Sequence, residues 1–204
     1  MTGPGAGDEY LAAVAGSQPP EQLSTLLAAA VHERWPVKTG ADAGAQGLVG
    51  STPRPADIAT LIGQPVPAVL PPDGRAGDVE NTVWQVDATL LGYELEQDHD
   101  YHLVLGDSAG NTMIAEIPDP AVLAPGSFFA GQITAARQAF ADYFKLKPTA
   151  VPLASGLAAT LAFAEVSVRV SVTGLGFFDF IHGQQGVAPN GVELHPVIGI
   201  SFPA

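Results

Sequence analysis

The chain has 204 residues, a formal net charge of −13 and no cysteine. Its length suits one domain with an extension or two small domains, and the lack of cysteine excludes disulfides and thiolate chemistry. The negative charge repels nucleic acid and anionic membranes and favours cations or basic partners. The 23 glycines and 18 prolines favour short strands and turns over long helices.

The sequence predicts a soluble protein with no membrane partner. Residues 1–5 lack a basic segment followed by an apolar stretch, so no secretory signal peptide is visible. The apolar stretches at residues 23–31 and 150–164 are too short to span a bilayer. Two compartments stay open, the cytoplasm or an exported form from which a signal has been removed.

Residues 1–78 are predicted to form a helical and proline-rich extension packed on the rest of the chain. Apolar residues at helical spacing from Leu23 to Val31 predict an amphipathic helix before residue 34. Seven prolines between residues 36 and 72 interrupt any long element, although residues 56–62 suit a short helix.

From residue 79 onward the apolar pattern predicts three strands in succession. In the first strand the alternation from Trp84 to Leu90 shifts its phase after Gly92, which indicates a β-bulge. The second and third strands are predicted at residues 101–105 and 113–117, joined by a short hairpin connection.

One helix and two further strands complete the predicted domain. Ser127 is the expected N-cap of the helix, whose apolar stripe comprises Phe129, Ile133, Ala136, Phe140 and Phe144. Apolar residues alternate with polar ones from Val166 to Thr173, the period of a half-buried strand. The last strand is expected to place Leu194, Pro196, Ile198, Ile200 and Phe202 on one face.

Three strands, a helix and two strands in this order are typical of the OB-fold. The predicted fold is therefore mainly β with helices, a five-stranded OB-like β-barrel with one helix between strands three and four. Residues 79–204 form this barrel and residues 1–78 the extension.

Two stretches of the sequence resemble a group of uncharacterised bacterial proteins. They are residues 98–120, DHDYHLVLGDSAGNTMIAEIPDP, and residues 172–202, VTGLGFFDFIHGQQGVAPNGVELHPVIGISF. The shared motifs are D-x-D-Y-H-L-V-L, T-M-I-A-E-I-P and E-L-H-P-V. Because those proteins have no assigned activity, the resemblance supports an OB-like fold and implies no function.

The order of elements is also remotely similar to that of staphylococcal-nuclease-type OB-folds. That resemblance implies a calcium site, with Asp98 and Asp100 in an acidic turn and Glu116 and Asp119 near the end of the third strand. Nuclease chemistry also needs cations that stabilise the transition state. No Lys or Arg lies between residues 75 and 137, whereas nine acidic residues lie from 80 to 119. The charge therefore disfavours this activity.

The candidate ligand-binding residues are acidic groups and one histidine. Asp98, Asp100 and Asp107 are expected to flank one end of the first hairpin and to bind a divalent cation, although the loop lacks EF-hand spacing. Glu116 and the loop residues Asp179 and His182 complete the set. The histidines near these carboxylates suit zinc or another divalent ion, or a structural role in hydrogen bonding to loops.

We expect a non-catalytic binding or interaction module with an acidic surface, which takes a protein or cationic ligand, no nucleic acid and no obligatory cofactor. One alternative is a metal-dependent hydrolase, a divergent nuclease-type OB barrel. It predicts that Asp98, Asp100 and Glu116 converge on one ion with a basic residue nearby. The other alternative is a structural domain of a larger assembly, with an exposed apolar patch around residues 150–164.

Overall fold

The computed structural model describes residues 34–96, 98–146, 161–181 and 183–203. The amphipathic helix predicted before residue 34 lies outside these residues, as does most of the apolar stretch 150–164. No helix in the described ranges is long and apolar enough to cross a membrane. In chain order the elements are α3 (Trp35–Lys38), η1 (Ala45–Leu48), β1 (Arg54–Ala56), α4 (Ile58–Ile62), α5 (Gly77–Glu80), β2 (Val83–Leu95), β3 (Tyr101–Gly106), β4 (Thr112–Ile117), α6 (Ala130–Phe144), β5 (Leu161–Phe178) and β6 (Val192–Ser201).

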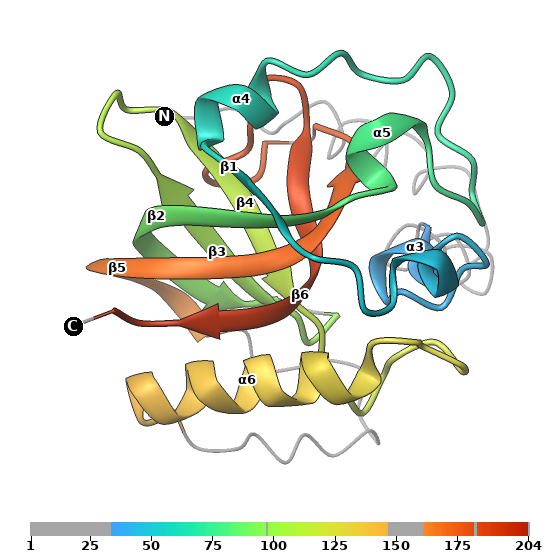
Figure 1. Cartoon of the computed structure of the whole chain (residues 1–204). Coiled ribbons are helices and arrows are strands. Elements are labelled where there is room, and N and C mark those ends of the chain that lie inside the picture. Colours follow the sequence, from blue (N-terminus) through green and yellow to red (C-terminus); the bar gives the residue numbers. More distant parts are fainter. Residues whose placement is uncertain (1–33, 97, 147–160, 182, 204) are drawn as a thin grey trace, which may run out of the picture.

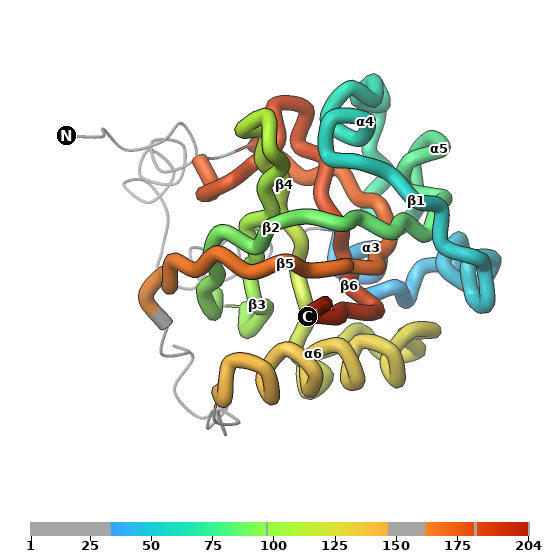
Figure 2. Tube along the Cα trace, turned by 60° about the vertical axis from the view of Figure 1, so that its left-hand side comes forward, coloured from blue at the N-terminus to red at the C-terminus, as the bar shows by residue number. Residues whose placement is uncertain are grey.

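The six strands form one mixed sheet in the order β1-β2-β3-β4-β6-β5, and β5 also pairs with β2. Five strands, β2 to β6, are therefore linked in a ring of hydrogen-bonded pairs. β4 pairs with β6 in parallel, and the other neighbours in the ring pair antiparallel. β2 and β5 run side by side, while α4 lies above and α6 below the strands in both views (Figures 1 and 2). Both helices contribute side chains to the main hydrophobic core. The mainly β fold, with a helix between the third and fourth strands of the ring, is confirmed.

Glycines allow the two longest strands to bend. The pairing of β2 shifts register between Leu90 and Gly92, which confirms the predicted bulge, and a Cβ at Gly92 would overlap the Phe163 ring. β5 is longer than predicted and continues through Gly174 and Gly176, where its register with β6 also shifts. These two glycines thus lie at strand irregularities.

The main hydrophobic core lies against one face of the strands, which we call the inner face. Leu103 and Leu105 of β3, Met113 and Ala115 of β4 and Phe140 of α6 belong to this core and are fully buried. Burial of each such large side chain contributes about 1.5–3 kcal/mol to folding. Since side chains alternate along a strand, the intervening residues of β3 and β4 lie on the opposite, outer face.

The helix α6 begins two residues later than the sequence predicts. Phe129, not Ser127, occupies the N-cap position, and helical residues start at Ala130. The Ser127 hydroxyl instead donates a hydrogen bond of 2.7 Å to the carbonyl of Thr39, which ties the loop before α6 to the segment after α3. The predicted apolar stripe is confirmed, because Phe129, Ile133, Ala136 and Phe140 are buried.

The last strand β6 does not keep a single alternation. Gly176 of β5 pairs with Leu194 and Gly174 pairs with Val197, so β6 carries one extra residue between these two pairs. Leu194 and Val197 consequently both belong to the main core, whereas Ile198 packs against a second, smaller cluster. The expectation that Leu194, Pro196, Ile198, Ile200 and Phe202 share one face was therefore wrong for Ile198, whereas Ile200 and Phe202 pack against the main core together with Leu194. Glu193 and His195, which flank Leu194, lie on the outer face.

Candidate metal centre

A group of charged side chains is buried on the outer face of β3, β4 and β6. Strand alternation explains their positions, because Asp100 and His102 are two residues apart, as are Glu193 and His195, and Glu116 pairs directly with His102 across the strands. Asp100, His102, Glu193 and His195 are at most 2% exposed, and Glu116 is 5% exposed. We call the following residues the outer-face cluster: Lys38, Glu96, Asp98, Asp100, His102, Glu116, Asp179, Glu193 and His195.

Asp100, Glu116 and His195 form the most deeply buried part of the outer-face cluster. His195 Nε2 lies 3.2 Å from Asp100 Oδ2, and His195 Nδ1 lies 3.0 Å from Glu116 Oε2. These contacts have ion-pair distances but not hydrogen-bond angles, since Asp100 Oδ2, Glu116 Oε2 and His195 Nε2 lack a hydrogen-bond partner within the described part of the chain. His195 Nδ1 is instead hydrogen-bonded to Glu193 Oε1 at 3.2 Å.

The spacing of these three residues suits a bound cation. Each residue offers one ligand atom, and the three atoms lie within 4.8 Å of one another. Two ligands about 2.1 Å from one ion lie roughly 3.0–3.4 Å apart in octahedral or tetrahedral geometry. The 3.2 Å between His195 Nε2 and Asp100 Oδ2 falls within this range. Glu193 occupies the position of the outer partner that usually orients a metal-binding histidine.

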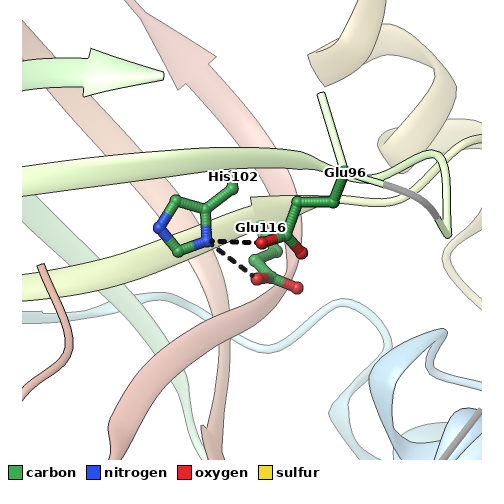
Figure 3. Close-up of side chains that lie close together, drawn as sticks. All are labelled: Glu96, His102 and Glu116. Atoms are coloured by element: carbon green, nitrogen blue, oxygen red, sulfur yellow. Dashed lines mark hydrogen bonds and ion pairs between the residues drawn. The ribbon is translucent and has the colours of Figure 1, made fainter. Parts of the chain in front are cut away.

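His102, Glu96 and Glu116 form a second group, in which both carboxylates face the same ring nitrogen (Figure 3). His102 Nδ1 lies 3.2 Å from Glu116 Oε1 and 3.5 Å from Glu96 Oε1. Its Nε2 lies 2.9 Å from the carbonyl oxygen of Gln185, in the loop between β5 and β6. Glu116 therefore belongs to both groups, and the Glu96 side chain, 33% exposed, lies nearest to solvent.

The carboxylates of the outer-face cluster disfavour one another's ionisation. Burial and then repulsion by Glu116 raise the pKa of Glu96 to about 8 and that of Glu193 to about 7. Burial and then repulsion by Asp100 raise the pKa of Asp98 to about 7. A bound cation would relieve this repulsion.

The neighbouring carboxylates favour the charged form of the two histidines. Burial lowers the pKa of His102, but its hydrogen bond to Glu116 and the attraction of that carboxylate raise it to about 9 overall. Burial also acts against the charged form of His195, yet attraction by Glu116 raises its pKa well above the usual value. These carboxylates therefore favour the protonated form of both imidazoles, and a metal ion would compete with that proton.

A lysine from a distant part of the sequence completes the outer-face cluster. Lys38, at the end of α3, forms an ion pair of 2.9 Å with Asp179, which directly follows β5. Burial lowers the pKa of Lys38, but attraction by Asp179, Glu116 and Glu193 outweighs it and raises the pKa. Its ammonium group also lies 5.5 Å from the centre of the Phe177 ring. One basic group therefore lies beside the carboxylates.

The structure brings together part of the site predicted from the sequence. Asp98, Asp100 and Glu116 lie in the outer-face cluster. Asp179 lies at the edge of the cluster, where it forms an ion pair with Lys38. His182 lies outside the described residues. Asp107 lies at the other end of β3, roughly 20 Å away along the strand. There its carboxylate caps the hairpin, accepting hydrogen bonds from the backbone of Ala109 and Asn111 at 2.8 and 2.9 Å.

Several cluster residues were missed or left undecided by the sequence. Asp100-x-His102 and Glu193-x-His195 place polar groups on one side of strands whose other side is apolar, and this signal could have selected both histidines. Lys38 carries no comparable signal, because only the packing of α3 brings it near Glu116 and Glu193.

No model of a protein family matches the chain, and a search of curated proteins also found no match. The function of the outer-face cluster is therefore inferred from its residues and their geometry.

Proposed function

We propose that this chain is a metal-dependent hydrolase whose divalent ion is held by Asp100, Glu116 and His195. The main support is a set of three buried atoms without hydrogen-bond partners among the described residues: Asp100 Oδ2, Glu116 Oε2 and His195 Nε2. Buried polar atoms are nearly always hydrogen-bonded, and an unsatisfied one costs about 1–3 kcal/mol. A cation held by these three residues would supply the missing partner of Asp100 Oδ2 and His195 Nε2, while Glu116 Oε2 lies 3.0 Å from the other ring nitrogen, Nδ1.

The ligand set favours a transition metal. One imidazole and two carboxylates suit Zn²⁺ or Mn²⁺ better than Ca²⁺, which takes six to eight oxygen ligands. Three protein ligands are also the number found in catalytic zinc sites, where water or substrate takes the remaining position. Such an ion lowers the pKa of bound water and so supplies a nucleophile near neutral pH.

The position of Lys38 is an argument for catalysis and not only for binding of an ion. The sequence argument against a hydrolase was the lack of a cation near the acidic strands, and the Lys38 ammonium provides one beside Glu116 and Glu193. A positive group at this position stabilises negative charge that develops on a substrate oxygen. The net charge of −13 favours a neutral or cationic substrate over nucleic acid.

We further propose that the ring of β2 to β6 is an OB-like barrel, related to the uncharacterised bacterial proteins that share its motifs. The proposal is supported by the five-membered strand ring and by α6, which lies between its third and fourth strands. In this fold the ligand is bound on an outer face of the strands, which is where the charged cluster lies.

A non-catalytic module that binds a cation is the second candidate function. It is favoured by the close cover over His102, where the Gln185 carbonyl is 2.9 Å from the ring and Gly186 packs on Val104. A metal ion under this loop would hold the acidic surface in place for a protein partner, without access for a substrate.

The two functions are separated by measuring metal binding and turnover on the same protein. Chelator-treated protein is titrated with Zn²⁺, Mn²⁺, Mg²⁺ and Ca²⁺, and thermal unfolding is followed together with hydrolysis of 4-nitrophenyl acetate and bis(4-nitrophenyl) phosphate. Stabilisation with turnover, both lost in Glu116→Gln and kept in the exposed control Asp87→Asn, supports the hydrolase. Stabilisation without turnover supports the binding module. The absence of both stabilisation and turnover would contradict both functions.

A further inference from the structure

We infer that the outer-face cluster holds two divalent ions bridged by the Glu116 carboxylate, the second ion being bound by Glu96 and His102. This inference rests on the proposed function, in which Asp100, Glu116 and His195 bind the first ion. It adds a second site, a bridging ligand and a defined stoichiometry.

The hydrogen bonds of His102 determine which ring nitrogen is available to a cation. The Gln185 carbonyl oxygen can only accept, so Nε2 must carry the proton in the 2.9 Å contact. In neutral His102, Nδ1 then presents a lone pair toward Glu116 Oε1 and Glu96 Oε1, at 3.2 and 3.5 Å (Figure 3). Three electron-rich atoms can face each other only around a proton or a metal ion. A backbone carbonyl that fixes the other nitrogen is typical of metal-binding histidines.

Glu116 is positioned to bridge the two sites. Its Oε1 atom lies 3.2 Å from His102 Nδ1, its Oε2 atom lies 3.0 Å from His195 Nδ1, and Glu116 belongs to both groups of ligand atoms. The two oxygens of one buried carboxylate therefore face the two histidines, which come from different strands. A carboxylate shared in this way holds two ions about 3.5–4 Å apart in two-metal hydrolytic sites.

The charge of the outer-face cluster also favours a second ion. Its six carboxylates and Lys38 sum to −5 when every carboxylate is ionised and both histidines are neutral, the state in which all of them are free to bind metal. One divalent ion changes this sum to −3, and two ions change it to −1. Repulsion between buried like charges is strong at low dielectric, so the second ion removes most of the imbalance that the first leaves.

The two sites differ in their access to solvent. Asp100 and His195 are fully buried, whereas the Glu96 side chain is 33% exposed. We therefore expect the ion at Glu96 and His102 to exchange with solvent faster than the ion at Asp100 and His195.

The experiment counts ions on the full chain. Metal-free protein is loaded with Mn²⁺, excess ion is removed, and bound manganese is measured by mass spectrometry beside calorimetric titration. We expect two ions per chain, one in His102→Ala, and two in the exposed control Asp87→Asn. The EPR spectrum of the loaded protein should show a coupled Mn²⁺ pair that becomes an isolated ion in His102→Ala. Circular dichroism of each metal-free variant checks that it has folded.

The outcomes separate this inference from the function on which it rests. One ion in both the unmodified protein and His102→Ala overturns the second site and leaves the hydrolase proposal standing. Two ions in both proteins would mean that the second ion binds away from His102, which also overturns the inference. No bound ion in the unmodified protein contradicts the two proposals together.

Discussion

His195 Nε2 and Asp100 Oδ2 lie 3.2 Å apart, both residues are fully buried, and neither atom has a hydrogen-bond partner in the described ranges. The two side chains come from positions 95 residues apart in the sequence. The other oxygen of Asp100 accepts a hydrogen bond of 3.2 Å from the backbone of Asp119, which fixes the carboxylate toward His195. Such a fixed, unsatisfied pair is expected where a ligand completes the arrangement.

Removal of the metal should destabilise the protein, and Asp100→Asn should abolish the difference. An ion at 100 times its dissociation constant stabilises the folded state by about 2.7 kcal/mol, or roughly 5–10 °C in a chain of this size. Thermal unfolding with and without Zn²⁺ or Mn²⁺ measures the effect. If Asp100→Asn keeps the full metal-dependent shift, Asp100 is not a ligand.

Lys38→Met should lower kcat on the order of 100-fold while leaving the amount of bound metal unchanged. The expected cause is the loss of the positive charge beside the carboxylates, since Lys38 itself is not a metal ligand. Asp179→Asn serves as the control, because it removes the 2.9 Å ion pair and retains the ammonium group. Equal losses of kcat in the two variants would show that Lys38 acts only through Asp179.

Arg34→Met should cost about 3–5 kcal/mol of folding stability, because it leaves the Glu80 carboxylate buried without its partner. The two guanidinium nitrogens of Arg34 lie 2.7 and 2.8 Å from the two oxygens of Glu80, which is fully buried. Arg54→Met is the matched control, since the Arg54–Asp78 pair has side chains 49% and 77% exposed and should contribute at most about 1 kcal/mol. Urea unfolding of both variants would contradict this expectation if the two losses were equal.

The strands and their order were predictable because local patterns determine them. The alternation in β2, its bulge at Gly92 and the apolar stripe of α6 each depend on neighbouring residues. The phase of β6 was not predictable, because it depends on an extra residue relative to Gly174 and Gly176 of β5. The register of β6 is set by its pairing with a strand distant in sequence, so it cannot be predicted from the residues of β6 alone.

The site was harder to predict than the fold for the same reason. Asp100 and Glu116 were selected as acidic residues, but their convergence with His195 depends on the parallel pairing of β4 with β6. Asp107 was grouped with Asp100 by proximity in sequence, although a strand separates them. Lys38 was passed over because the net charge was assessed along the sequence, whereas the field at Glu116 depends on distance in space.

The loop between β5 and β6 should control metal affinity through Gly186. This residue has a φ of +81°, and a Cβ there would overlap the side chain of Val104, so Gly186→Ala should lift the loop and withdraw the neighbouring Gln185 carbonyl from His102. Loss of such an outer partner typically weakens metal binding about 10- to 100-fold. Gly183→Ala is the control, because Gly183 has a similar φ of +95° but no described atom within 4 Å of the added Cβ. Calorimetric titration with Mn²⁺ compares the two, and equal affinities would show that the Gln185 contact does not orient His102 for metal binding.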